Sequence, residues 1–290
     1  MQHSRQQRRT LIMGILNVTP DSFSDGGQHD DAGSALAQAE RMLAEGADII
    51  DVGGESTRPG AEPVHPGEEQ RRVFPVVEEL VLRQGVKVSL DTRHAETAHT
   101  VLQMLGNRAA DLIINDVSGL LTDPEMPGVI AQAGCEVVIM HNRGDSRTMQ
   151  SKTDYDDVVE DVIAELLQIR QPYLDAGVPA ERIILDPGIG FAKTHGQNWE
   201  LIRNLYRFTA LTHGETPHRV LFGASRKGFL GALLADQPQP ADQRDTATAA
   251  LSAFAAQQGS WAVRVHAVRP NADAVAVGSQ VRAGFSPFSP

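Results

Sequence analysis

The sequence has only one cysteine and no apolar run that approaches the ~20 residues of a membrane span. Cys135 cannot form an intrachain disulfide, which is typical of a protein from a reducing compartment. Its neighbours offer no base or cation that would activate a thiol, so we expect it to pack in the core. The apolar stretch at 11–16 is too short for a secretory signal. We therefore expect a cytoplasmic protein with no membrane partner.

Positive charge is also scarce, because 26 Lys and Arg residues stand against 37 Asp and Glu residues, for a net charge of -11. Nucleic-acid binding requires clustered cations, so we expect no nucleic-acid partner. No Walker-type Gly-Lys-Ser/Thr ending and no HExxH occurs, and Gly188-Ile189-Gly190 lacks the rest of a dinucleotide fingerprint. An anionic substrate must therefore be held by a locally basic pocket that the overall charge does not reveal.

No Gly/Ser-rich, Pro-rich or single-charge stretch interrupts the middle of the chain, so no linker is predicted. The 290 residues, 41% of them hydrophobic, suffice for one large core. We expect a single domain over residues 11–285, preceded by a flexible segment at residues 1–10.

Eight short apolar runs end in a polar residue and are each followed by a segment compatible with a helix. Their starts lie roughly 25 to 45 residues apart, which is the repeat of βα units. The predicted strands are Leu11–Asn17, Asp48–Gly53, Val86–Asp91, Asp111–Asn115, Glu136–His141, Arg182–Asp186, Arg219–Ala224 and Trp261–His266.

The segments between these runs have Ala, Leu, Val and Glu at helical spacing, as in Ala32–Glu45, Glu68–Leu82, Asp156–Leu174 and Asp242–Gln257. Strands and helices therefore alternate along the chain. Eight such units predict an α/β fold, a (β/α)8 TIM barrel. A doubly wound open sheet is the alternative, because the number of strands alone does not prove closure.

Polar residues stand at or just past the carboxyl end of every predicted strand. In a TIM barrel these ends converge on one face, so residues far apart in the sequence form a single polar site. The residues at these ends are Asn17, Gly53-Gly54-Glu55, Asp91, Asn115-Asp116, His141, Asp186, Ser225-Arg226-Lys227, Arg264 and His266.

Asp91, Asn115 and Asp186 each have an ordinary alternative role as the cap of the next helix. Together, their carboxylates and amide can bind the paired donors and acceptors of a flat heterocycle in a buried pocket. The last two strands end in Gly223-Ala224-Ser225-Arg226-Lys227-Gly228 and Arg264-Val265-His266. These ends are the usual phosphate region of this architecture, although isolated cations often only line a solvated rim. In an acidic protein they indicate an anion pocket, and a pyrophosphate fits this charge.

Two loops carry the most specific signal. Residues 17–27 are Asn-Val-Thr-Pro-Asp-Ser-Phe-Ser-Asp-Gly-Gly, and residues 53–60 are Gly-Gly-Glu-Ser-Thr-Arg-Pro-Gly. By composition alone, each could be an ordinary polar or glycine-rich connection. As strings they resemble the dihydropteroate synthases, and the resemblance extends from Leu11 to about Val268, with motifs at all eight strand ends in that family's order.

The resemblance implies a transferase that condenses 6-hydroxymethyl-7,8-dihydropterin pyrophosphate with p-aminobenzoate. The products are 7,8-dihydropteroate and pyrophosphate, and the reaction belongs to folate biosynthesis. It also implies Mg²⁺ as the cofactor and a homodimeric assembly.

The same resemblance implies roles for individual residues. The pterin-binding positions are Asp91, Asn115, Asp186 and Lys227. The region around p-aminobenzoate, where sulfonamides compete, comprises Thr57, Arg58, Pro59, Phe191 and Lys227. Asn17 matches the residue that contacts Mg²⁺ and pyrophosphate, and the other anion-binding positions are Arg58, Arg264 and His266. Asp21 and Phe23 match the closing first loop, and the implied catalytic residues are Asp21, Arg58 and Lys227.

Two positions depart from the family's pattern. Ala267 follows His266 where many members have Asp, which removes a possible orienting carboxylate, and Gly228 replaces a Ser that is common after the Lys. The intact loops nevertheless favour a synthase over two alternatives that share the pocket, a non-catalytic pterin-binding paralogue and a pterin-using methyltransferase. A hydrolase built from Ser225 and His266 is disfavoured because no Gly-x-Ser-x-Gly elbow surrounds the serine.

Overall fold

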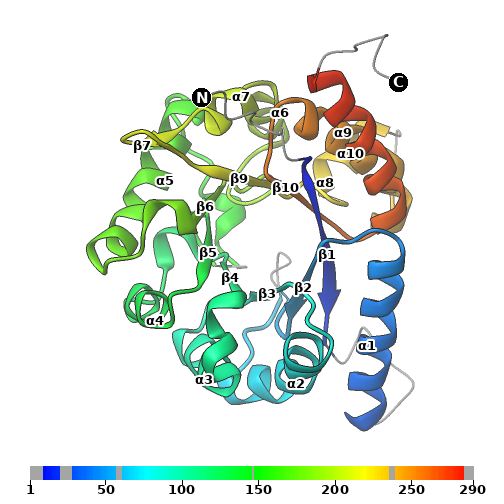
Figure 1. The fold of residues 1–290 in the computed structure, drawn as a ribbon. Helices are drawn as coiled ribbons and strands as arrows, with labels where there is room; N and C mark the ends of the chain where they lie inside the picture. The colour runs from blue at the N-terminus through cyan, green and yellow to red at the C-terminus, as the bar shows by residue number, and fades with distance from the viewer. Residues whose placement is uncertain (1–8, 20–27, 57–60, 146, 235–238, 284–290) are drawn as a thin grey trace, which may run out of the picture.

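A computed structural model describes residues 9–19, 28–56, 61–145, 147–234 and 239–283. Among these residues, eight parallel strands close into one barrel, and the helices form a ring around them (Figure 1). Closure is shown by the pairing of the first and last strands, in which Leu11 lies opposite Ala262. The predicted TIM barrel is confirmed, and the open sheet is excluded. The barrel strands are β1 (Leu11–Asn17), β2 (Ile49–Gly53), β3 (Val88–Asp91), β4 (Ile113–Asp116), β5 (Glu136–Met140), β6 (Ile183–Asp186), β9 (Arg219–Phe222) and β10 (Ala262–Val265).

The helices follow the strands as the spacing predicts. They are α1 (Gln28–Ala44), α2 (Pro66–Glu78), α3 (Ala95–Leu105), α4 (Met126–Ala133), α5 (Val158–Asp175), α6 (His195–Arg203), α7 (Leu205–Thr209), α8 (Gly228–Leu234), α9 (Asp245–Gln257) and α10 (Val268–Ala283). Shorter helical turns are η2 (Glu79–Arg83), which is a π-helix, and the 3₁₀ segments η3 (Gly106–Asp111), η4 (Gly119–Leu121), η5 (Met149–Ser151), η6 (Ala180–Arg182) and η7 (Ala241–Arg244). An antiparallel ribbon of β7 (Thr212–His213) and β8 (Thr216–Pro217) precedes β9 and was not predicted.

Side-chain caps begin two of these helices. The Asp157 carboxylate accepts hydrogen bonds from two backbone N–H groups of the first turn of α5, which otherwise have no partner within the helix. Thr194 and Gln197 form a reciprocal capping box at the start of α6. These caps fix the points at which the chain leaves the loops after β5 and β6 and enters the outer ring.

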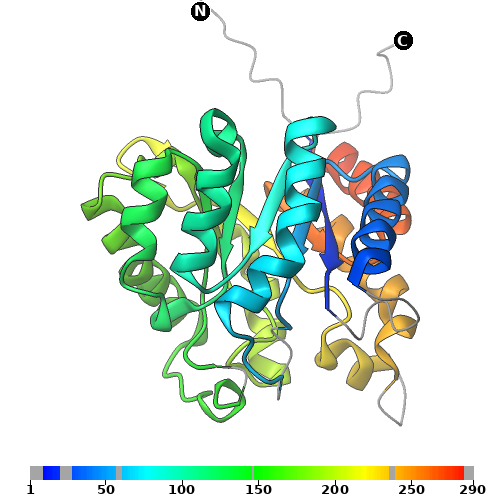
Figure 2. The same ribbon diagram turned by 90° about the horizontal axis from the view of Figure 1, so that it is seen from below.

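Side chains in each strand alternate between the inside of the barrel and the helix-covered outside. On β2, for example, Ile49 packs in the barrel and Ile50 packs against the helices. The inward residues nearest the strand starts form one apolar layer that closes the barrel floor, made of Met13, Ile49, Ile113, Val138, Ile184, Leu221 and Ala262. A ligand can therefore enter only from the other end, to which the arrowhead of β1 points in Figure 2.

The described end of the amino-terminal segment contacts the barrel, and the single cysteine lies in the core. Of residues 1–10, the structure describes only the last two. The Thr10 hydroxyl donates to the Ser260 carbonyl oxygen at 2.6 Å, and Arg9 pairs with Asp48. Cys135 is fully buried, and burial raises the pKa of its thiol to about 12, so its predicted place in the core is confirmed. No helix in the described part of the chain is long and apolar enough to span a membrane.

Candidate active site in the barrel mouth

A polar layer lies inside the barrel, two residues further along the strands than the apolar layer. Three members were predicted from the strand ends, Asn115, Asp186 and Arg264, and they follow Ile113, Ile184 and Ala262 at the inward spacing of two. Asp91 occupies the same level on β3, where it pairs in register with Asn115. The strand topology thus brings together residues that are up to 173 positions apart.

Asp51 belongs to the same layer, although the sequence analysis did not single it out. It is completely buried and lies on β2, two residues after the apolar-layer residue Ile49. The signal that could have found it is the alternation within the strand, because a carboxylate in the middle of a buried strand must point into the barrel. Attention to strand ends alone missed it.

The Arg264 guanidinium joins two of these carboxylates. Its Nε donates to Asp51 Oδ2 at 2.6 Å, and its Nη2 donates to Asp91 Oδ2 at 2.6 Å. Burial alone would disfavour the charge of Arg264, but the two carboxylates outweigh burial and raise its pKa. Arg264 is therefore charged at any pH at which the protein is folded, and it places a fixed cation at the centre of the polar layer.

Two carboxyl groups of this layer titrate close to neutral pH. Burial raises the pKa of Asp91 to about 7, although Arg264 acts in the opposite direction. Burial likewise raises the pKa of Asp186 to about 6, against the Gly188 N–H and the charge of Lys227. Each group can thus serve as a hydrogen-bond acceptor or, when protonated, as a donor, and the charge of the barrel mouth depends on pH.

Among the described residues, the functional atoms of Asn115 and Asp186 make few hydrogen bonds. The Asn115 amide donates to both oxygens of Asp51 at 3.5 Å, the long limit of a hydrogen bond. Asp186 Oδ1 accepts from the Gly188 N–H at 2.7 Å. A Cβ on Gly223 would stand 3.5 Å from Asp186 Oδ2, so glycine at the end of β9 leaves that side of the carboxylate open.

Lys227 approaches this layer across the turn after β6. Its ammonium lies 3.8 Å from the centroid of the Phe191 ring, a cation–π contact, and its charge acts on Asp186. Gly190 makes this approach possible: it has a φ of +86°, and a Cβ there would lie 2.6 Å from Lys227 Cδ. The predicted neighbours Phe191, Lys227 and Asp186 are therefore close in space.

His266 directly follows β10 and lies next to Ser225, which follows β9. The Ser225 hydroxyl and His266 Nδ1 are 2.9 Å apart, and the His266 N–H donates to the same hydroxyl at 3.2 Å. These contacts fix the histidine at the rim. Arg226 between Ser225 and Lys227 turns instead to Asp245, which it binds through Nε and Nη2 at 2.7 Å each, so it is neutralised outside the polar layer.

Asn17 ends β1 and pairs in register with Gly53, which places it at the same end of the barrel. Its side chain is partly exposed, and no cluster of three or more His, Cys, Asp or Glu side chains that could hold a metal occurs in the described part of the chain. The other predicted site residues, Asp21, Phe23, Thr57, Arg58 and Pro59, lie outside the described residues.

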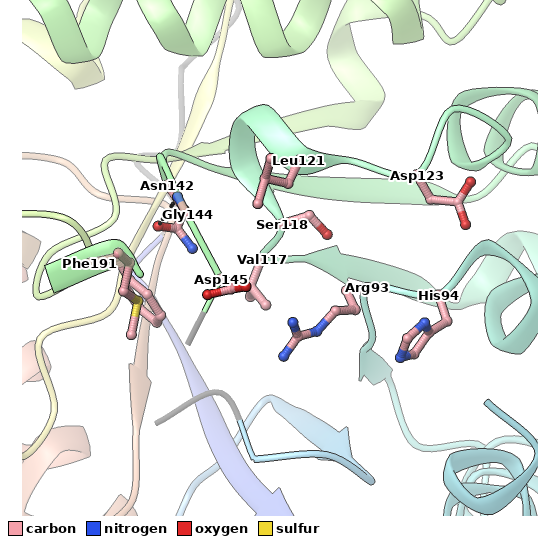
Figure 3. Close-up of a pocket in the computed structure, with 11 residues that line it drawn as sticks. Arg93, His94, Val117, Ser118, Leu121, Asp123, Asn142, Gly144, Asp145 and Phe191 are labelled. Carbon is pink, nitrogen blue, oxygen red and sulfur yellow. Dashed lines mark hydrogen bonds between the residues drawn. The ribbon is translucent and has the colours of Figure 1, made fainter. Parts of the chain in front are cut away.

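A cavity of about 330 Å³ adjoins the polar layer and is lined by residues that follow β3, β4, β5 and β6. In Figure 3, Arg93 and Phe191 lie on opposite sides of it. Arg93 is anchored by Glu55 Oε1 at 2.9 Å. The cavity shares strand ends with the polar layer, but Asp91, Asn115 and Asp186 do not line it. Phe191 lines the cavity, belongs to the predicted aminobenzoate region and lies beside Lys227. The cavity therefore offers space for a ligand next to the polar layer.

Comparison with known proteins decides the family. A family model described as pterin binding enzyme matches residues 13–266. A dihydropteroate synthase of Mycobacterium leprae is 46% identical over 278 residues, which cover 94% of this chain and 94% of the relative. The chain belongs to the dihydropteroate synthases. It is an enzyme, a transferase, and its polar layer lies in the part of the barrel that the family model covers.

Solved structures of other dihydropteroate synthases agree along the whole barrel. The enzyme of Burkholderia cenocepacia complexed with 7,8-dihydropteroate has a TM-score of 0.83 at 39% identity and covers 95% of this chain and 92% of its own. The Yersinia pestis enzyme, solved in a sulfonamide drug complex, has a TM-score of 0.84 at 38% identity over 95% of both chains. The predicted family and fold are confirmed, whereas the roles of single residues remain predictions.

Proposed function

We propose that this dihydropteroate synthase joins 6-hydroxymethyl-7,8-dihydropterin pyrophosphate to p-aminobenzoate by direct substitution. The amine nitrogen forms a bond to the pterin CH₂ carbon, the bond from that carbon to oxygen breaks, and pyrophosphate leaves with its electrons while one proton is released. The observation that carries this proposal is the buried layer of carboxylates, amide and guanidinium at the base of a mouth that is closed below.

The pterin ring would bind to Asp91, Asn115, Asp186 and Lys227. A 2-amino-4-oxo pyrimidine edge has adjacent donors and acceptors. These match carboxylates and an amide that make few hydrogen bonds to the described residues. Leaving these buried groups without partners costs roughly 1–3 kcal/mol each, so a ligand that lacks the edge binds poorly. The open side of Asp186 next to Gly223 supports a place for the ring there.

The aminobenzoate would lie against Phe191 and Lys227, beside Thr57, Arg58 and Pro59 of the second loop. The contact between the Lys227 ammonium and the Phe191 ring supports this position, because it forms an apolar face with a cation beside it. A planar aromatic ring fits the face, and its carboxylate fits a nearby cation. A sulfonamide, which also carries an aromatic amine, would compete for the same space.

The pyrophosphate would be bound by Asn17, Arg58, Arg264 and His266. Arg264 offers five N–H donors, and Asp51 and Asp91 use only part of them. Mg²⁺ characteristically takes one or two protein oxygens and completes its shell with phosphate oxygens and water, so the amide oxygen of Asn17 fits without an acidic cluster. When bound, Mg²⁺ would neutralise charge that develops on the leaving pyrophosphate.

The catalytic contribution would come from Asp21, Arg58 and Lys227. The carboxylate of Asp21 would stabilise positive charge on the pterin as the leaving group departs, and Arg58 and Lys227 would orient the amine and the ring. No covalent enzyme intermediate is required. The first and second loops would exclude water, which competes as a nucleophile.

The decisive assay combines purified protein, Mg²⁺, the dihydropterin pyrophosphate and p-aminobenzoate, with both products quantified. We expect equal amounts of dihydropteroate and pyrophosphate. Asp186→Ala and Lys227→Ala should each lower turnover about 100-fold or more. Each variant loses a charged hydrogen bond to the pterin, worth roughly 1.5–3 kcal/mol, and also loses the orientation of the substrate that this bond provides. Near-normal turnover by both variants would contradict the site assignment.

The enzyme would act in the cytoplasm as a homodimer of this chain. Ultracentrifugation of the purified protein tests the assembly without reference to activity.

A further inference from the structure

The turn between β6 and α6 has an unusual backbone. Gly188 and Gly190 have positive φ angles of +67° and +86°, and Ala192 has a φ of +49° although it carries a Cβ. Left-handed backbone at a non-glycine residue costs about 1–2 kcal/mol. Such a conformation persists only where neighbouring groups hold it, and strained turns of this kind are concentrated at functional sites.

Lys193 supplies two of the hydrogen bonds that hold this turn. Its side chain is buried, and its ammonium donates to the carbonyl oxygens of Gly188 at 3.1 Å and Phe191 at 2.9 Å. The Tyr155 hydroxyl adds a bond to the next carbonyl, that of Ala192, at 2.9 Å. The two lysine bonds span the segment that carries Phe191, so they fix where its ring lies relative to the Lys227 ammonium.

His141 provides the third acceptor for the buried ammonium. Lys193 Nζ and His141 Nδ1 are 2.9 Å apart, and His141 Nε2 lies 2.9 Å from Glu165. Burial lowers the pKa of His141 to about 4, so the ring is neutral. A neutral ring with its proton on Nε2 donates to Glu165 and accepts from Lys193, which gives each of the three ammonium protons one acceptor.

This arrangement costs stability. Burial lowers the pKa of Lys193 to about 7, although the carboxylates of Asp186 and Glu165 oppose the fall. An apolar side chain of the same length would avoid the cost of burying a charge. The turn is built around the ammonium nonetheless, and it adjoins both Asp186 and Phe191.

We propose that Lys193 is a positioning residue for the arylamine: its ammonium clamps the carbonyls of Gly188 and Phe191 so that Phe191 is held against Lys227. This inference rests on the proposed function for the identity of the bound amine. Lys193 itself contacts backbone and His141, and it acts through Phe191.

The test compares Lys193→Met with Arg170→Met. Methionine keeps the apolar stem of Lys193 and removes its charge. Arg170 is the matched control, because it is also a buried cation with a histidine partner, His218 at 2.8 Å, but that partner precedes β9 at the other end of the barrel. We expect Lys193→Met to raise the KM for p-aminobenzoate about tenfold or more. The KM for the pterin substrate should change much less, and Arg170→Met should leave the ratio of the two KM values unchanged.

Hydrogen exchange gives a readout that does not depend on turnover. Amide exchange in a peptide covering residues 187–194 should accelerate at least tenfold in Lys193→Met and not in Arg170→Met. Absent turnover by the unaltered enzyme would refute the proposed function, while the exchange comparison would still decide whether Lys193 holds the turn. Unchanged exchange in this peptide, or an equal rise of both KM values, would overturn the proposal.

A milder pair of variants covers the case in which Lys193→Met does not fold. Glu165→Gln removes the charge behind His141, whereas Glu160→Gln alters an exposed glutamate on the same helix, paired only with Arg207 in the described structure. We expect Glu165→Gln to raise the KM for p-aminobenzoate about threefold and Glu160→Gln to have no effect. Equal KM values in the two variants would argue against the clamp.

Discussion

Asp51 offers the most direct test of the polar layer, because it is fully buried and holds Arg264 at 2.6 Å. Asp51→Asn keeps the shape of the side chain and one acceptor oxygen but removes the charge. A hydrogen bond between charged groups is worth roughly 1.5–3 kcal/mol and a neutral one about 1 kcal/mol, so we expect the free energy of unfolding to fall by about 1–2 kcal/mol. Urea unfolding measures this change.

The same substitution should shift a pKa in a direction that a merely destabilised protein would not show. The charge of Asp51 raises the pKa of Asp91, so its removal lowers that pKa from about 7. On acidification, the KM for the pterin pyrophosphate should therefore begin to rise at a lower pH in the variant than in the unaltered enzyme. A profile of this KM from pH 5 to 8 measures the shift.

Asp48→Asn is the matched control for Asp51→Asn. Asp48 precedes the same strand at the opposite end of the barrel, and it pairs with the exposed Arg9. An ion pair with an exposed partner contributes only ~0–1 kcal/mol, and the asparagine side chain keeps an acceptor oxygen for the Ile12 N–H that Asp48 binds at 2.8 Å. This variant should leave the pH profile in place. If Asp51→Asn matched the control in both measurements, Asp51 would not organise Arg264 and the description of the polar layer would be wrong.

Three further predictions concern the same mouth. Gly190→Ala should lower kcat/KM at least tenfold, because its Cβ would lie 2.6 Å from Lys227 Cδ at a φ of +86°; steady-state kinetics with a circular dichroism control checks this. The KM for the pterin substrate should rise more steeply below about pH 6, where Asp186 gains a proton in addition to Asp91, and Asp186→Asn should remove this second part of the rise. Cys135 should resist a thiol reagent at pH 8 until the protein is unfolded by urea, because its pKa is about 12 and it is buried; rapid labelling of the folded enzyme would refute this.

The pH dependence of stability follows from the sign of the same shifts. Asp91 and Asp186 have folded-state pKa values above their ordinary 3.8, so these two groups bind more protons in the folded protein than in the unfolded chain between about pH 4 and 7. The contribution of these two groups to stability is therefore greatest in acid and falls as the pH rises through that window. A group that binds the ligand at neutral pH thus lowers the stability of the empty barrel.

The barrel could be predicted from the sequence because its signal is repeated eight times, and small errors in one strand do not change the pattern. Strand bounds differ by at most two residues at either end; for example, the run predicted from Val86 begins at Val88. The strand ends also identified Asp91, Asn115, Asp186 and Arg264, since topology alone brings them to one face. Local pattern was sufficient wherever the functional residue ends a strand.

The interior partners could not be predicted in the same way. That Arg264 binds Asp51 rather than leaving all its donors free depends on the register of β1, β2 and β10 around the barrel, which no local pattern specifies. Arg226 shows the reverse case, because its basic sequence context indicated the anion pocket, whereas Asp245 at the start of α9 binds it. Lys193 was missed because a lysine after Phe191 has the appearance of an exposed helix-start residue until the turn is seen to enclose it.

Stability and function share the strands of this barrel but use different levels of them. Four of the seven floor positions, Ile184 among them, are followed two residues later by a residue of the polar layer, such as Asp186. The same alternation that closes the barrel therefore fixes the height and direction of the ligand-binding groups. Because the floor is apolar, the charged residues described inside the barrel lie above it, where Arg264 offsets two carboxylates and a substrate can complete the remaining hydrogen bonds. An acidic chain can bind an anionic leaving group because this local balance, and not the net charge of -11, determines the field in the mouth.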